Sequence, residues 1–135
     1  MALVAVVLLA LLVLTALVAD GGVLFAARRD LQGTADGAAR AGAGALDLAV
    51  YRASDGRIAQ LDPALARSAA NRFLAAQGFA GRVTVTADTA QVSVDLGREL
   101  RPPLLSMFGA GAIEVDARAV ARPRTGIATP EALLR

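Results

Sequence analysis

Hydrophobic side chains follow three patterns along this chain, and each pattern predicts a different kind of element. Residues 1–19 are apolar throughout except for Thr15. Residues 24–52 repeat small and apolar side chains at helical spacing, whereas residues 82–96 and 113–119 alternate apolar with polar side chains, as half-buried strands do. The pattern therefore predicts an apolar helix, a second helical region and a small sheet.

The first apolar run, MALVAVVLLALLVLTALVA, is long enough to cross a membrane. Nineteen residues at about 1.5 Å each give roughly 28 Å of helix, close to the hydrocarbon thickness of a bilayer. Leucine and valine favour insertion, and no charged side chain precedes Asp20. The sequence therefore predicts a transmembrane helix at residues 1–19.

The alternative interpretation of this run is a signal peptide that is removed from the mature protein. Such a leader has a basic start, an apolar core of about 7 to 15 residues, and small residues at the first and third positions before the cut. Here no arginine precedes the run, the run is longer, and a cut after Ala19 would place Leu17 at the third position. These features favour an anchor that stays in the protein.

Residues 20–52 form an extension rich in alanine and glycine, for which the spacing predicts a helix. Its apolar positions recur every seven residues from Leu24 to Ala45. Each glycine inside a helix costs about 1 kcal/mol relative to alanine, so these glycines indicate the close approach of another helix or a sheet. The residues that we expect to serve helix packing and assembly are Leu24, Leu31, Gly33, Gly37, Gly42 and Gly44.

Gly21 and Gly22 lie at the junction between the apolar run and the extension. Because the helical spacing resumes directly after them, we expect one helix of about fifty residues with a hinge or kink at this pair. The alternative is a short loop that joins two separate helices. The segment 53–57, which contains an Asp-Gly turn, is expected to end the helical region.

Residues 53–122 predict a small α+β domain, followed by a mobile tail at 123–135. Asp62 and Pro63 are typical of a helix N-terminus, and Gly78 is typical of a C-terminal cap. The alternating segments predict a three-stranded antiparallel sheet that begins with a hairpin. We expect an interruption from residue 97 to 103 and a short apolar helical turn under the sheet at 104–109.

The expected core of this domain lies between the short helix and one face of the sheet. The helix contributes a stripe of Leu65, Ala69, Phe73 and Ala76, with Leu61 and Phe79 at its two ends. The strands contribute Val83, Val85, Val92, Val94, Ile113 and Val115, and the cover is formed by Leu65, Phe73 and Phe108.

Composition narrows the chemistry that this chain can carry. Fourteen arginines oppose twelve acidic residues without forming a basic run, which does not favour binding to nucleic acid. Histidine and cysteine are absent, which excludes a histidine general base and a thiolate zinc site, and the serines have neither histidine nor lysine to activate them. We therefore predict a protein that is not an enzyme, with no catalytic, cofactor-binding or metal-binding residues.

Several short motifs follow the apolar run in a characteristic order. They are Ala19-Asp20-Gly21-Gly22, Ala27-Arg28-Arg29, Leu31-Gln32, and Ala35-Asp36 with Ala38-Ala39. A later stretch, LLSMFGAGAIEVDARAVARP, places an apolar Phe-Gly segment before an alternating strand that is rich in alanine. In order and spacing, these motifs resemble the TadE/TadG-like proteins of the tight-adherence (Flp) pilus system.

The resemblance implies a small envelope protein with a pilin-like fold. Such a protein is a minor pilin, a pseudopilin or an assembly component of a type IVb pilus or its secretion apparatus. Its partners are the lipid bilayer and other pilus or secretion proteins that contact the N-terminal helix, and homo- or hetero-oligomers are compatible with this role. A membrane-anchored binding or adhesion module unrelated to pili remains an alternative, as does, with less support, an anchored enzyme that uses aspartate, serine and arginine.

The chain departs from the pilin-type pattern in two ways, since it has neither a basic leader before the apolar helix nor a glutamate near the start of that helix. A start further upstream, an already trimmed chain and an unprocessed membrane component all stay open. The orientation is also open, because Arg28 and Arg29 after the span favour a cytoplasmic domain by the positive-inside rule, whereas the resemblance implies the extracytoplasmic side. We follow the resemblance.

Overall fold

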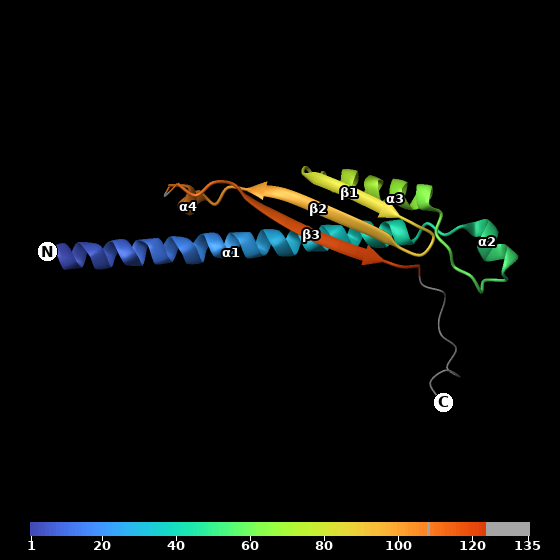
Figure 1. Ribbon diagram of the computed structural model, residues 1–135, viewed down its shortest axis with the longest axis horizontal. Helices are drawn as coiled ribbons and strands as arrows, with labels where there is room; N and C mark the ends of the chain where they lie inside the picture. The colour runs from blue at the N-terminus through green and yellow to red at the C-terminus, as the bar shows by residue number, and fades with distance from the viewer. Residues whose placement is uncertain (108, 124–135) are drawn as a thin grey trace, which may run out of the picture.

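A long N-terminal helix dominates the computed structural model, which describes residues 1–107 and 109–123. This helix, α1 (Ala2–Ala43), contains 42 residues, and only its C-terminal part lies along the rest of the chain (Figure 1). The elements that follow are α2 (Leu48–Ala53), α3 (Pro63–Ala76), β1 (Arg82–Ala87), β2 (Val92–Leu100), α4 (Pro103–Met107) and β3 (Ile113–Ala121). The expected α+β class, with a long apolar helix before short helices and a sheet, is confirmed.

The sheet contains three antiparallel strands in the order β1-β2-β3. The expected hairpin joins β1 to β2, and its turn is held by the Asp88 side chain, whose Oδ1 accepts hydrogen bonds from Ala90 N and Gln91 N at 2.7 Å each. The interruption expected from Gly97 is wrong, because β2 continues to Leu100 and pairs there with Ile113. The chain leaves the sheet only where two prolines, which have no N–H to donate, follow Arg101.

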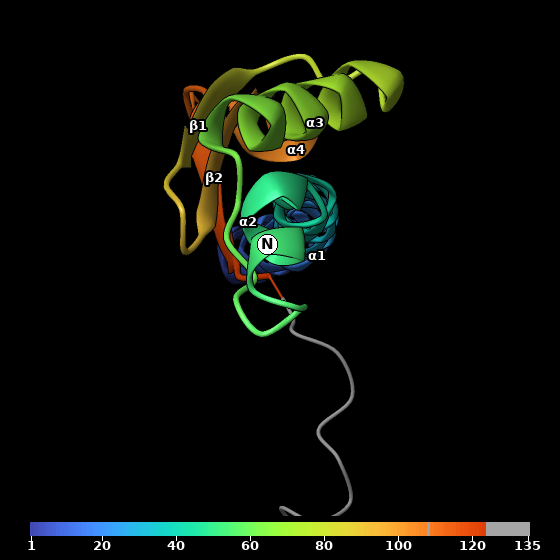
Figure 2. The ribbon, with the colours of Figure 1, turned by 90° about the vertical axis from the view of Figure 1, so that its right-hand side faces the viewer.

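Both α1 and α3 lie on the same face of the sheet, so that one layer of helices covers one layer of strands (Figure 2). The other face of the sheet carries the more polar side chains, including the ion pair between Arg82 and Asp116 at 2.6 Å. The buried core consists of Leu31, Ala35, Ala38 and Ala39 of α1; Leu61; Ala66, Ala70 and Leu74 of α3; and Val92, Val94, Leu96, Ala117 and Ala119 of the sheet.

The buried face of α3 differs by one position from the expected stripe. Leu65 is 54% exposed, whereas Ala66, Ala70 and Leu74 are buried, and Phe73 is only partly buried against the core. The reason is that α3 packs against α1 as well as against the sheet. The small side chains of α3 face this crowded contact, and the bulky Leu65 is left in solvent.

The ends of the inner sheet face are also more exposed than expected. Val83 and Ile113 are exposed because each lies on an edge strand and near a strand end, whereas Val92 and Val94 on the central strand are fully buried. Val85 and Val115 are partly buried against the core. The expected contribution of Phe108 and the expected mobile tail beyond residue 123 lie outside the described residues.

The helix α1 ends earlier than the expected rod of about fifty residues, and it has no loop at the glycine pair. It passes through Gly21 and Gly22 without interruption, which excludes the two-helix alternative. After Gly44, Leu46 forms a bridge with Leu61, and the chain then starts a separate helix, α2. Asp47 caps α2 by accepting hydrogen bonds from Ala49 N and Val50 N. The expected rod therefore ends at Ala43, and its last residues form the separate helix α2.

Truncation of Leu74 tests the observed face of α3. We expect Leu74→Ala to lower the free energy of unfolding by about 2–4 kcal/mol, because it leaves a cavity in the core. The matched control in the same helix, Leu65→Ala, should change it by less than about 0.5 kcal/mol. Urea unfolding of the full chain in detergent micelles, followed by circular dichroism, measures both, and a larger loss at Leu65 would contradict this packing.

Candidate functional site

The first half of α1 presents an apolar surface with little cover from the rest of the chain. Within the described residues, α1 is the one helix that is long and apolar enough to cross a membrane. Among residues 2–19 only Ala16 is buried, and large side chains such as Leu8 and Val18 are exposed. A bare apolar surface of this length needs lipid or other apolar helices around it.

The second half of α1 has a face of small residues that is already covered by the same chain. A Cβ atom added at Gly42 would lie 3.0 Å from both the Ala66 carbonyl oxygen and Val92 Cγ1. A Cβ atom added at Gly37 would lie 2.6 Å from Cζ of the Phe73 ring. These two glycines therefore allow α3 and β2 to approach the α1 backbone within the chain.

The other expected packing residues lie in different surroundings. Leu31 is buried in the core and Leu24 is half-buried. Gly44 is exposed just after α1 and has only carbonyl oxygens of α1 near it. Gly33 and the expected hinge residues, Gly21 and Gly22, have nothing within 4 Å of an added Cβ atom, so these positions are open to another molecule.

Asp20 has a role that the sequence analysis missed. Its side chain is almost fully buried and accepts hydrogen bonds from Leu105 N at 2.6 Å and Leu104 N at 3.4 Å. The carboxylate thereby caps the first turn of α4, which follows 84 residues later in the chain. The expectation that this apolar turn packs under the sheet is wrong, because α4 packs against α1.

A local signal for this contact was present in the sequence, although it did not identify the partner. The residues directly before α4 are Arg101 and Pro102, and neither is a side chain that caps a helix. The unpaired N–H groups of α4 therefore needed an acceptor from elsewhere. Asp20 was the acidic residue that ended the apolar run, and only the fold brings it to α4.

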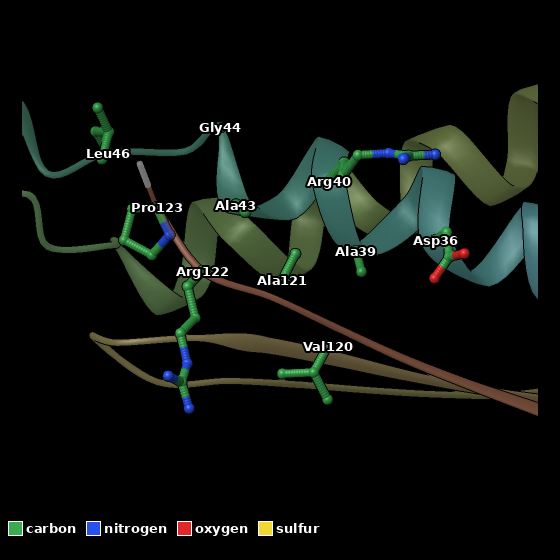
Figure 3. Close-up of a pocket in the computed structure, with 10 residues that line it drawn as sticks. All are labelled: Asp36, Ala39, Arg40, Ala43, Gly44, Leu46, Val120, Ala121, Arg122 and Pro123. Carbon is green, nitrogen blue, oxygen red and sulfur yellow. The ribbon is translucent and has the colours of Figure 1, made fainter. Parts of the chain in front are cut away.

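A groove lies between the end of α1 and the end of β3, and Figure 3 shows the residues that line it. It encloses about 920 Å³, which is in the size range of small-molecule sites. Its charged side chains are Asp36, Arg40 and Arg122, and Arg122 extends away from α1 (Figure 3). Among the described residues that line it there is no serine, threonine or tyrosine, so this groove offers no hydroxyl nucleophile.

The comparison with known families finds a match in the N-terminal part of the chain. Residues 1–55 match the model of a family described as putative Flp pilus-assembly TadE/G-like. This match confirms, over those residues, the resemblance expected from the sequence motifs, and it supports involvement in pilus assembly. No curated protein and no solved structure matches the chain.

Alanine at Gly42 and at Gly33 should have opposite effects on stability. We expect Gly42→Ala to lower the free energy of unfolding by about 1–2 kcal/mol, because overpacking against Ala66 and Val92 exceeds the gain in helix propensity. Gly33→Ala meets no atom and should raise it by about 0.5–1 kcal/mol. Urea unfolding in micelles measures both changes, and stabilisation by Gly42→Ala would contradict the close approach.

Removal of the Asp20 carboxylate should loosen α4 without unfolding the sheet. In Asp20→Ala the amides of Leu104 and Leu105 lose their acceptor, at a cost of about 1–2 kcal/mol. Hydrogen exchange measured by mass spectrometry should therefore be faster in residues 103–107 and unchanged in β2. The control Asp30→Ala removes an exposed carboxylate from the same helix. Equal exchange in α4 of both variants would show that the cap contributes nothing.

Proposed function

We propose that this chain is a non-enzymatic, minor-pilin-like or pseudopilin-like component of a tight-adherence (type IVb, Flp) pilus or of its secretion apparatus. The observation that carries this proposal is the division of α1 into two halves with different surroundings. The first half is an uncovered apolar helix, and the second half is part of the core of a small α+β domain. The family match over residues 1–55 includes both halves of this helix.

The proposed contact surface is the exposed apolar side of α1 around the junction. Leu17, Val18, Val23 and Phe25 are all more than half exposed, and the open positions Gly21, Gly22 and Gly33 lie among or just after them. Small residues let the backbones of two helices approach closely, so this surface suits the helices of other pilus proteins or of a second copy. The buried Leu31 and Gly42 and the half-buried Gly37 serve packing within the chain instead.

We propose that α1 is anchored in the membrane by residues 1–19 and that residues 20–52 and 53–122 lie on the extracytoplasmic side. The length and exposure of the apolar half support the anchor. Arg28 and Arg29 argue for the opposite orientation by the positive-inside rule. The pilus-assembly match supports the extracytoplasmic side, because a pilus lies outside the cytoplasm.

An anchored binding or adhesion module remains the second candidate. The observation that favours it is the extent of the match, which ends at residue 55 and leaves α3 and the whole sheet unmatched. In this case the anchor resembles a pilus-assembly protein, and the sheet domain binds a target of its own. The two candidates differ in whether α1 contacts pilus proteins.

Crosslinking from the exposed side of α1 tests the proposed function. The chain has no cysteine, so single cysteines can be introduced one at a time. We expect Val23→Cys and Phe25→Cys to crosslink to other pilus-system proteins in cells that assemble pili, because both side chains are exposed beside the membrane. Deletion of the gene should reduce surface pili, counted by electron microscopy.

The matched control for crosslinking is Ile58→Cys, which is also exposed but lies in the loop after α2, at the far end of the domain from α4 (Figure 1). Ile58→Cys should give no crosslink to the pilus-system proteins that Val23→Cys and Phe25→Cys reach. The same variant should react with a membrane-impermeant maleimide in cells whose outer layer is permeabilised, if the domain is extracytoplasmic. Absence of crosslinks together with unchanged pili after deletion would favour the anchored module instead.

A further inference from the structure

The helix α4 lies beside the last turns of the apolar half of α1, beyond the end of the sheet that points toward the N-terminus (Figure 1). The Asp20 carboxylate fixes it there by accepting hydrogen bonds from Leu104 N and Leu105 N. Pro102, directly before α4, is fully buried. The position of α4 along α1 is therefore set by Asp20, the residue directly after the apolar run.

The surface of α4 is apolar and uncharged. Met107 is 81% exposed and Leu104 is 38% exposed. The one hydroxyl group of α4, on Ser106, donates its hydrogen bond to the Pro103 carbonyl oxygen at 2.9 Å. No charged side chain occurs between Arg101 and Glu114. An exposed apolar surface of this kind is unfavourable in water.

Beside α4, the apolar surface of α1 continues past Asp20. Because the Asp20 carboxylate is buried under α4, it does not expose a charge on this part of the helix. Val23 and Phe25 are exposed beyond it, and the next charged side chain is Arg28. From the first residue to Ala27, α1 therefore offers about 40 Å of apolar helix, which exceeds the hydrocarbon core of a bilayer and extends into its headgroup region.

We infer that α4 is an interfacial element that inserts Leu104 and Met107 into the lipid headgroup region beside the transmembrane helix, and so sets the depth of the domain on the bilayer. This inference rests on the proposed membrane anchoring. A lipid surface is the occupant that fits, since α4 adjoins the apolar half of α1 and both lack exposed charge. A stable protein interface buries roughly 800 Å² per partner, which a helix of five residues does not supply.

Tryptophan fluorescence in vesicles tests this inference, because the chain has no tryptophan of its own. The full chain carrying Met107→Trp is reconstituted into phosphatidylcholine vesicles that contain a minority of phosphatidylglycerol. We expect its emission to shift to the blue relative to the exposed control Ile58→Trp. Lipids brominated close to the headgroup should quench it more strongly than lipids brominated near the chain ends, and neither lipid should quench Ile58→Trp.

A third variant, Val13→Trp, separates failure of the inference from failure of the membrane anchor. Quenching of Val13→Trp without quenching of Met107→Trp would overturn the interfacial role of α4 and leave the anchor intact. Absence of quenching in both would overturn the anchor as well. A nitroxide on Met107→Cys gives a second measurement, since it should be more accessible to oxygen and less accessible to a water-soluble nickel complex than the same label on Ile58→Cys.

Discussion

The close contact between α1 and the two elements that cover it is the constraint on which the rest of the structure depends. Ala35 and Ala38 of α1 are completely buried, and the backbone at Gly42 lies against Ala66 and Val92. Such small side chains bring the helix axis near both α3 and the sheet. A domain built from residues 53–122 alone would lack the core residues that α1 contributes. Small domains bury little apolar surface, so such a loss is costly for their stability.

The strands were predictable from the sequence because strict alternation of apolar and polar residues indicates a strand. The face of α3 that is buried was not predictable in the same way. An alanine-rich helix has several faces of similar hydrophobicity, so the large Leu65 and Phe73 determined the expected stripe. In the fold, the neighbour of α3 is another helix, so that Ala66 and Ala70 are buried and the Phe73 ring packs over Gly37 of α1. Which helix lies next to α3 is a property of the tertiary structure, and local spacing does not contain it.

The contact between Asp20 and α4 escaped prediction for a related reason. A helix cap is usually found within a few residues of the helix that it serves, and here the acceptor precedes the donors by 84 residues. The open positions on α1 were predictable as glycines, but their separation into positions that face the core and positions that face outward was not. The glycines 33, 37 and 42 have the same residue type and differ only in what the fold puts opposite them.

The motifs of the matched segment acquire a physical meaning from this packing. Leu31 is buried in the core, and the neighbouring Gln32 donates a hydrogen bond from Nε2 to the Arg118 carbonyl oxygen of β3 at 3.0 Å. The segment 1–55 therefore carries one side of a contact whose other side lies in the unmatched sheet. In the sheet, that other side consists of Val92, Val94, Leu96, Ala117 and Ala119.

Because α1 is continuous, the orientation of its apolar half is linked to the orientation of the sheet that covers its second half. The glycine pair at 21–22 is held on both sides, by the Asp20 bonds to α4 before it and by the contact with the sheet after it. A bend at this pair would either break the hydrogen bonds of Asp20 or move α4 relative to the sheet. While those bonds persist, the apolar half of α1 is tied to the sheet through α4 as well as along its own axis. In the proposed anchoring, a tilt of the apolar helix would therefore also incline the sheet.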